Sequence, residues 1–196
     1  MRFGDFLKKE IFEPLGMKDT DFWVPAEKQD RLAKVYDCRE GQPSVRYLDN
    51  NLGIQNDMAY RPAYEAGGAG LASTIDDYAK FTQMLLNGGT YNGVQILRPA
   101  TVKFLGGHTL SAAQQAGFDN WIGLEGFSYG NLMRVLVDPT RAVTLGSKGE
   151  FGWDGWLGCY MEVVPEQNMT FLMMTQKKDA GTYTLSRKIR NIIFSE

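Results

Sequence analysis

After residue 118 the sequence changes to short apolar segments that are separated by turn-forming residues. Four of these segments have the length and composition of β-strands, and they form two pairs, each joined by only a few residues. The first pair turns around Tyr129-Gly130-Asn131 and the second around residues 165–168. Connections this short join antiparallel neighbours, so they constrain this part of the chain to antiparallel hairpins. The predicted strands are residues 120–127, 132–137, 156–164 and 169–176.

A helix is predicted to close the chain over residues 182–194. Its apolar residues follow the helical period, and those predicted to be buried are Leu185, Ile189, Ile192 and Ile193. The basic run around Arg187, Lys188 and Arg190 is interpreted as the solvated face of this helix. Antiparallel strands that pack against a helix indicate an α+β fold.

The first 118 residues begin with a helical pattern and then lose it. A helix is predicted over residues 3–12, where Pro14 stops it and Gly16 follows in a turn. Residues 20–70 keep no period, and the one short strand predicted there lies near residues 32–36. Irregular segments of this length inside a domain tend to line functional clefts.

The clearest helix signal is the run Ser73-Thr74-Ile75-Asp76-Asp77. A hydroxyl N-cap followed by acids satisfies free N–H groups and suits the helix dipole. The helix is predicted to end at residues 87–89 (Asn-Gly-Gly), and a second one to run from Pro99 to Leu105. The residues predicted to share one face of the first helix are Ile75, Tyr78, Phe81 and Leu85.

Composition excludes several classes of function. The 196 residues are 43% hydrophobic and 22% charged, which is typical of a globular chain with one core. A net charge of -2 gives no electrostatic basis for binding nucleic acid. No apolar stretch approaches the roughly 20 residues that span a bilayer, and the first residues do not have the pattern of a signal peptide. The sequence therefore favours no particular compartment.

Most catalytic and binding motifs are absent from the sequence. Cys38 and Cys159 match no metal spacing and are interpreted as two ordinary thiols. His108, the single histidine, is flanked by glycines and is interpreted as a loop residue rather than a general base. Neither a phosphate loop nor a GxSxG elbow is present, and no metal or cofactor is predicted.

A second kind of serine chemistry depends on the pattern SxxK, in which a lysine one helical turn after the serine activates its hydroxyl. The chain has seven serines, and none of them is followed by a lysine three residues later. The sequence therefore contains no recognisable activated nucleophile.

Several segments, in order, resemble the class C β-lactamase-like serine hydrolases and penicillin-binding proteins. Residues 11–20 (IFEPLGMKDT) are similar to the IFxPLGMxDT stretch of that family, and residues 66–78 to its GGxGLxSTxxDY pattern. The similarity continues through residues 84–89 and 96–102, and residues 151–158 (FGWDGWLG) resemble its HTG or KTG strand. The resemblance implies an antiparallel sheet flanked by helices, with an active site between the sheet and a helical lobe.

The last of these motifs implies specific roles for four residues. By analogy with the family, the backbone N–H of Trp156, directly after Gly155, would supply half of the oxyanion hole. Trp153 and Asp154 would take the substrate-binding positions. Because Trp153 replaces a Lys or His, the charge that attracts a substrate carboxylate is lost unless Lys148 or another residue supplies it. Ester or amide substrates without a required carboxylate are therefore predicted.

The resemblance also implies that this chain is one incomplete domain over residues 1–196. The helical lobe and irregular cleft region would occupy residues 1–118, and the strands and terminal helix residues 119–196. The family's SxxK and YxN motifs come before its IFxPLGM stretch, so both are expected upstream of Met1. The chain alone is therefore predicted to be inactive, and its uncovered face is predicted to associate as a homodimer or a larger assembly.

Two alternatives accompany this prediction. The run Tyr129-Gly130-Asn131 has the form YxN but falls at a predicted hairpin, where Gly-Asn is typical of a turn. A non-catalytic module is the other possible function. In that case Trp121, Trp153, Trp156 and Tyr160 would form an aromatic ligand surface.

Overall fold

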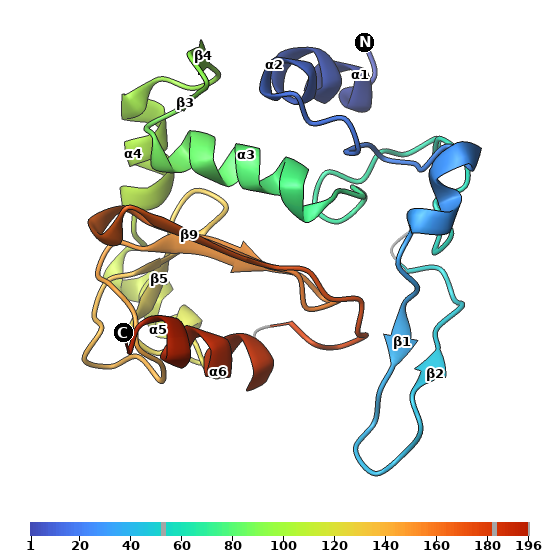
Figure 1. The fold of residues 1–196 in the computed structure, drawn as a ribbon. Helices are drawn as coiled ribbons and strands as arrows, with labels where there is room; N and C mark the ends of the chain where they lie inside the picture. The colour runs from blue at the N-terminus through green and yellow to red at the C-terminus, as the bar shows by residue number, and fades with distance from the viewer. Residues whose placement is uncertain (52–53, 182–183, 196) are drawn as a thin grey trace.

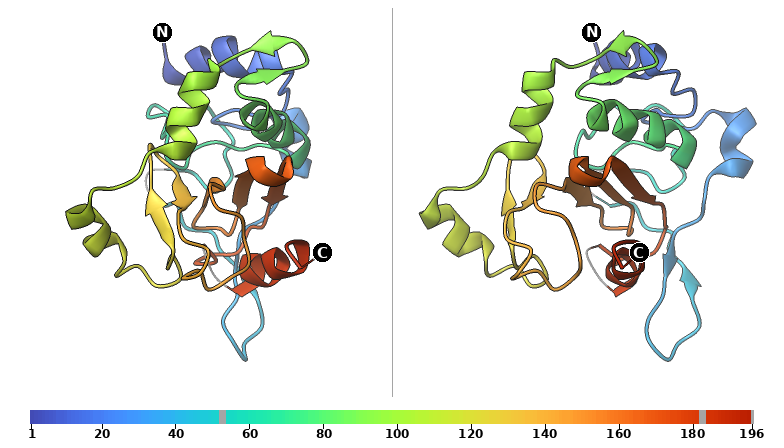
Figure 2. Two further views of the ribbon diagram at one scale, coloured as in Figure 1. Left: turned by 90° about the vertical axis from the view of Figure 1, so that its left-hand side faces the viewer. Right: turned by 60° about the vertical axis from the view of Figure 1, so that its left-hand side comes forward.

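The computed structural model describes residues 1–51, 54–181 and 184–195. At its centre is a sheet with the strand order β5-β6-β7-β8-β9, in which all neighbours are antiparallel. Its strands are β5 (Phe127–Tyr129), β6 (Arg134–Leu136), β7 (Phe151–Asp154), β8 (Tyr160–Val164) and β9 (Met169–Met173). The helices α3 (Ile75–Leu86) and α6 (Thr184–Ile193) lie on opposite faces of this sheet (Figures 1 and 2). The predicted α+β class is confirmed.

Both predicted hairpins are present, as β5–β6 and β8–β9, but their first strands begin later than predicted. Residues 120–126 form turns instead of a strand, so β5 begins only at Phe127. Residues 155–159 also form a turn, because Gly155 N–H donates to Cys159 O at 2.8 Å. The strand predicted over residues 156–164 therefore begins at Tyr160. The segment before this turn is β7, which the family resemblance implied.

Alternate residues of β8 contact the two layers that cover the sheet. Met161 and Val163 belong to the main hydrophobic core, together with Leu85 of α3. Glu162, between them, contacts Arg190 of α6. This alternation is the period of two that a strand imposes, and it gives the sheet one apolar and one partly charged face.

The most buried residues of α6 are polar, in contrast to the prediction, and the predicted Ile189 and Ile193 are half-buried. Ser186 and Arg190 are buried, whereas Leu185 and Ile192 are 53% and 63% exposed. The predictions that Leu185 and Ile192 are buried and that Arg190 is solvated are therefore wrong. Residues 182–183 of the predicted helix lie outside the described residues.

The rotation of α6 has an electrostatic cause. The Arg190 guanidinium donates to Glu150 Oε1 at 2.6 Å and also pairs with Glu162, and both carboxylates are buried in the sheet. Leaving these buried acidic groups without their cation is far more costly than leaving two apolar side chains in water. Leu185 and Ile192 are therefore turned outward.

The chain begins with one continuous helical segment that passes Pro14. It consists of α1 (Phe3–Leu7), the π-helical turn η1 (Lys8–Phe12) and α2 (Glu13–Leu15). The prediction that Pro14 stops the helix is wrong, because Pro14 lies in α2, directly after the π-helical turn, and the segment continues to Leu15. Gly16, with a φ of +67°, ends the segment. Met17 N–H donates to Phe12 O at 2.7 Å, as in a Schellman cap.

The predicted helix after Ser73 is confirmed as α3, with Thr74 as its N-cap. Thr74 Oγ1 accepts from Asp77 N–H at 3.3 Å, and the helix ends at Asn87. Leu85 is buried and Tyr78 is partly buried against the core, as predicted, but Ile75 is 48% exposed. Ile75 is the first residue of α3 and is not among the residues that pack in the hydrophobic core.

A buried hydrogen-bond network ties α3 to the segment after α2. Asp77 accepts from Asp19 N–H at 2.6 Å, from Thr20 Oγ1 at 3.1 Å and from Lys80 Nζ at 2.9 Å. Burial alone would raise the pKa of Asp77, but these hydrogen bonds outweigh it and lower the pKa below its usual value. Two of the motifs that carried the family resemblance therefore meet here in a structural role.

The remaining helices follow α3 in the chain. The predicted helix from Pro99 is confirmed as α4 (Pro99–Gly107), with Pro99 in its first turn. A further helix, α5 (Ala112–Phe118), was not predicted, although Ser111 and Gln114 form a capping box at its start. A short hairpin, β3 (Thr90–Tyr91) with β4 (Val94–Gln95), was not predicted either.

The irregular region contains a second hairpin, which projects away from the sheet (Figure 1). It consists of β1 (Tyr36–Asp37) and β2 (Val45–Arg46), preceded by the 3-10 helix η2 (Ala26–Arg31). The strand predicted near residues 32–36 overlaps β1 only at Tyr36. Tyr36 N–H donates to Gln176 O at 2.9 Å, so the base of this hairpin is fixed to the segment that follows β9.

Candidate active site

The predicted motif residues lie together at the end of β7, where the strand turns toward β8. Gly155 N–H donates to Cys159 O, and Gly158 N–H donates to Gly155 O, both at 2.8 Å. Trp156 O accepts from Ala180 N–H at 3.0 Å, which fixes the peptide on the far side of the turn. Within the described residues, no backbone hydrogen bond uses the N–H of Trp156. A backbone donor held in a rigid turn and left without an acceptor is suited to an oxyanion.

The glycine before this donor is not required by the fold. A Cβ added to Gly155 would have Cys159 O, at 3.9 Å, as its nearest neighbour. A Cβ added to Gly152, inside β7, would lie 2.0 Å from Met161 O. Close packing therefore requires glycine at position 152. It does not require glycine at position 155, where a side chain would have room.

Two loops hold the Trp156 side chain. Its indole N–H donates to Asp179 Oδ1, and its ring lies edge-on to the Tyr47 ring, with the centroids 5.8 Å apart. Lys178 Nζ lies 5.4 Å from the same Tyr47 ring. The loop after β2 and the segment after β9 therefore meet at the turn that carries the Trp156 N–H.

Asp154 is the last residue of β7, and its charge is compensated. Its carboxylate forms an ion pair with Arg134 of β6, and the two side chains are only 7% and 3% exposed. Three aromatic rings surround the Arg134 guanidinium, at 4.9 Å for Tyr160 and 5.7 Å for both Phe127 and Trp153. Asp154 thus brings little net negative charge to the site.

A cavity of about 260 Å³ opens beside this turn. The residues that line it are Trp121, Leu124, Trp153, Asp154, Gly155, Trp156 and Gly181. The four residues predicted as site residues thus line one cavity. Trp121 comes from the loop after α5, and no local sequence signal connects it to β7.

A second group of buried ionisable side chains lies between α6 and the sheet. It consists of Arg190 of α6, Glu162 of β8 and Glu150, which directly precedes β7. Desolvation and the neighbouring Glu162 raise the pKa of Glu150 to about 8, although the Arg190 guanidinium opposes this shift. Arg190 Nη1 also donates to Tyr160 Oη at 3.0 Å, and the pKa of Tyr160 is raised to about 12, chiefly by desolvation. Because Tyr160 is only 5% exposed, its predicted place on an aromatic ligand surface is wrong.

His108 and Tyr129-Gly130-Asn131, the other catalytic candidates from the sequence, are not among the residues that line this cavity. His108 is in the loop between α4 and α5, where its ring packs 5.5 Å from the Phe104 ring. Tyr129-Gly130-Asn131 leads into the β5–β6 turn, as predicted, with Gly130 N–H donating to Met133 O at 2.7 Å.

The thiols of Cys38 and Cys159 are both free, and burial raises the pKa of the Cys159 thiol. In the described part of the chain, no group of three or more His, Cys, Asp or Glu side chains is arranged to hold a metal ion. None of its helices is long and apolar enough to cross a membrane.

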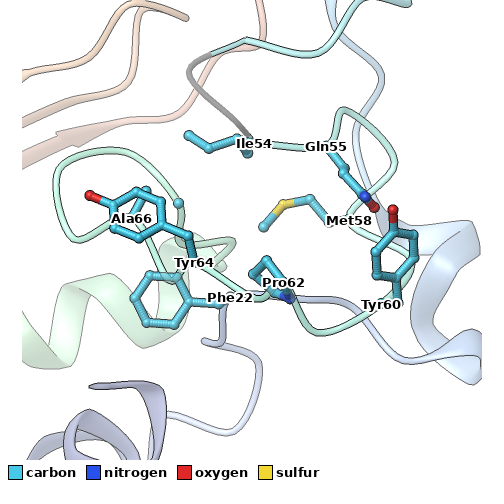
Figure 3. Close-up of a pocket in the computed structure, with 9 residues that line it drawn as sticks. Phe22, Ile54, Gln55, Met58, Tyr60, Pro62, Tyr64 and Ala66 are labelled. Atoms are coloured by element: carbon cyan, nitrogen blue, oxygen red, sulfur yellow. The ribbon is translucent and has the colours of Figure 1, made fainter. Parts of the chain in front are cut away.

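A second hollow lies in the irregular region, between the segment after α2 and residues 54–70 (Figure 3). Phe22, Met58 and Pro62 form its apolar wall, and Gln55 and Tyr60 lie at one end. Its volume of about 10 Å³ accommodates at most one water molecule. The cavity beside β7 is therefore the better candidate for a substrate site.

The sequence profile of the Beta-lactamase family matches residues 1–192 of the chain. The fold, the ordered motifs and this match agree: the chain belongs to the β-lactamase family of serine hydrolases. The chain spans less than half the length of the curated relatives described next.

Two curated relatives and one solved structure illustrate the similarity. Protein Rv1367c of Mycobacterium tuberculosis is 32% identical over 177 residues, which are 87% of this chain and 42% of that protein. An Escherichia coli protein named "Putative D-alanyl-D-alanine carboxypeptidase" is 30% identical over 184 residues, 88% of this chain and 39% of that protein. EstCE1, a hydrolase with promiscuous acyltransferase activity, superposes with a TM-score of 0.77 at 22% identity. That superposition covers 97% of this chain and 50% of EstCE1, so it shows a shared fold.

Proposed function

We propose that this chain supplies the HTG or KTG strand motif, residues 153–155, to the active site of a serine hydrolase. That enzyme would cleave esters or amides through an acyl-enzyme. The observation that carries the proposal is the N–H of Trp156, which no backbone hydrogen bond among the described residues uses. It follows Gly155, where a Cβ would meet no atom closer than 3.9 Å, and both residues line the cavity of about 260 Å³. When a serine hydroxyl attacks the substrate carbonyl, the new C–O bond leaves negative charge on the carbonyl oxygen. The Trp156 N–H donates to that oxygen until the leaving alkoxide or amine departs with a proton.

The serine is proposed to come from a segment outside these 196 residues. None of the seven serines has a lysine three residues later, so no hydroxyl in this sequence has the activating partner that SxxK chemistry needs. The chain alone is therefore proposed to be inactive. Residues 1–196 would form one incomplete domain, with the helical lobe in residues 1–118 and the sheet with its terminal helix in residues 119–196.

The charges at the site favour esters over substrates with a required carboxylate. Trp153 takes the position of the Lys or His of the family motif, and Asp154 is already paired with Arg134. Lys148 cannot easily compensate, because it is exposed in the loop before β7, whereas the cavity lies beyond the other end of that strand. An anionic substrate group thus meets no free cation among the described residues that line the cavity.

The test is the substrate preference of a longer protein that contains this chain together with its SxxK segment. Hydrolysis of p-nitrophenyl acetate and butyrate is expected at rates that clearly exceed those on nitrocefin and on a D-Ala-D-Ala peptide. Efficient hydrolysis of nitrocefin or of the peptide, with no activity on the p-nitrophenyl esters, would show that the substrate assignment is wrong.

A non-catalytic ligand-binding module is the second candidate, and the aromatic walls of the cavity favour it. Trp121 and Trp156 are 52% and 37% exposed, and exposed indoles are suited to holding a ligand whether or not chemistry follows. The two candidates differ in the longer protein. Serine-dependent turnover there supports the enzyme, whereas binding without turnover supports the module.

Self-association of the chain is proposed through its uncovered apolar surface. Leu185 and Ile192 form an outward apolar stripe on α6, and β9 is an edge strand of the described sheet. A homodimer is expected in light scattering. Ile192→Lys should shift the population toward monomer, while Leu132→Lys, at a 79% exposed residue in the β5–β6 turn, should not. A monomeric parent chain would contradict this proposal.

A further inference from the structure

The aromatic residues around the candidate site meet at nearly right angles. The Trp153 ring lies 6.2 Å from the Trp121 ring at an interplanar angle of 89°, and 5.3 Å from the Tyr129 ring at 77°. These three rings come from β7, from the loop after α5 and from the end of β5. Perpendicular rings leave the edge of one and the face of another open to a third ring, which prefers edge-to-face or offset contacts.

One aromatic wall of the cavity is solvent-exposed, although its floor is buried. Trp121 is 52% exposed, whereas Leu124, three residues later, is only 3% exposed. The exposed indole is not required to cover the core, because Leu124 already packs with Phe127 and Leu136 in a separate apolar cluster. An apolar ligand that covered Trp121 would remove this surface from water.

The charge and size of the cavity restrict the ligand further. Asp154 is the one ionisable side chain among the described lining residues, and it is neutralised by Arg134. A charged ligand group would lose hydration there without gaining a free counter-charge. An apolar cavity of about 150 Å³ is large enough for benzene. The 260 Å³ found here therefore accommodates one ring and the carbonyl attached to it.

We infer that this cavity binds an uncharged aromatic ring, as the acyl or leaving group of an ester, and holds it against Trp121 and Trp153. This inference rests on the proposed function and names its substrate class. The ring contacts would place the ester carbonyl next to the Trp156 N–H, because Trp156 lines the same cavity. Trp121 is then the specificity-determining residue, because it contacts the ligand without taking part in the oxyanion hole.

Binding to the 196-residue chain tests this inference without any nucleophile. The probes are phenylacetamide, its anionic analogue phenylacetate and the aliphatic hexanamide, each titrated while tryptophan fluorescence is recorded. Three of the four tryptophans line the cavity, so saturable quenching by phenylacetamide is expected. Phenylacetate and hexanamide are each expected to bind about tenfold more weakly, a difference of about 1.4 kcal/mol.

Variants of single tryptophans test whether Trp121 contacts the bound phenylacetamide. Trp121→Ala is expected to weaken phenylacetamide binding about tenfold, and Trp121→Phe to restore most of it. Trp23→Phe, which removes an indole that lines neither cavity, should leave the affinity unchanged. Equal affinities for the three probes, no saturable quenching, or an unchanged affinity in Trp121→Ala would each overturn the inference. None of these results depends on turnover, so ester hydrolysis by the longer protein remains a separate test of the proposed function.

Discussion

Arg134 of β6 and Asp154 of β7 form a buried ion pair one residue before the glycine of the family motif. The guanidinium lies 4.9 Å from the Tyr160 ring and 5.7 Å from the Trp153 ring, so it is enclosed by the same aromatic residues that border the site. The pair fixes the end of β7 at the point where the chain turns to expose the Trp156 N–H. It also explains how an acidic residue is accommodated beside a proposed oxyanion hole.

Removal of one partner should cost much more than replacement of both. Arg134→Met leaves the Asp154 carboxylate buried without its cation, and a loss of about 3–5 kcal/mol in the free energy of unfolding is expected. The double variant Arg134→Met/Asp154→Leu should be more stable than Arg134→Met alone, because no uncompensated charge remains. Urea unfolding of Arg134→Met, Asp154→Leu and the double variant measures this. Strictly additive losses would contradict a coupled pair.

Two glycines in the same strand region should respond differently to alanine. Gly152→Ala places a methyl group against Met161 O, and a loss of about 1–3 kcal/mol in the free energy of unfolding is expected. Gly155→Ala has space for the methyl group, so its stability should stay within about 0.5 kcal/mol of the parent. In the longer, active protein, Gly155→Ala should instead reduce ester hydrolysis. Equal losses of stability would show that the fold itself needs Gly155.

The stability of the chain should depend on the protonation of Glu150. Its pKa is about 8 in the folded state, compared with an ordinary value of 4.5, so the folded state binds the extra proton between these values. Stability therefore falls as pH rises through this range and levels off above it. Glu150→Gln should flatten the profile of thermal unfolding against pH, while Glu166→Gln, at an exposed residue, should not. An unchanged profile in Glu150→Gln would contradict the assignment.

The Asp77 network should contribute to stability with the opposite dependence on pH. The pKa of Asp77 is lowered in the folded state, so its contribution is present above the ordinary value of 3.8 and is lost as pH falls below it. Asp77→Asn should destabilise the chain by about 1–3 kcal/mol at neutral pH, because buried donors lose a charged acceptor. Asp76→Asn is the control, since Asp76 lies in the same helical turn but is exposed. Similar losses in both variants would show that the helix dipole, rather than the network, carries the effect.

The sequence predicted the helices whose first residues carry a capping residue or a proline. The cap at Thr74 and the proline at the start of α4 were both found where the sequence placed them. The rotation of α6 could not be predicted in this way. Its outcome depends on Glu150 and Glu162, which lie about 30 to 40 residues away from Arg190 in the sequence. The spacing of apolar residues predicts which residues of a helix share a face. Which face of α6 packs on the sheet depends on the buried acidic residues that pair with Arg190.

The same distinction applies to the candidate site. Trp153, Asp154, Gly155 and Trp156 are contiguous, so one motif identified all of them, and they line one cavity. Arg134, Tyr129 and Trp121 reach the site from other segments, through strand pairing and ring contacts that no local pattern records. The sequence could therefore indicate where the oxyanion donor lies and that tryptophans form a ligand surface, but not that Asp154 is paired with Arg134 or that Tyr160 is buried.

The most direct test of the central claim is the hydrolysis of p-nitrophenyl acetate by the 196-residue chain, alone and joined to a segment that carries SxxK and YxN. No serine-dependent turnover by the chain alone is expected. Turnover by the joined protein is expected, and it should be lost when the SxxK serine is replaced. Turnover by the chain alone that disappears on replacement of one of its own seven serines would show that the nucleophile lies within these 196 residues.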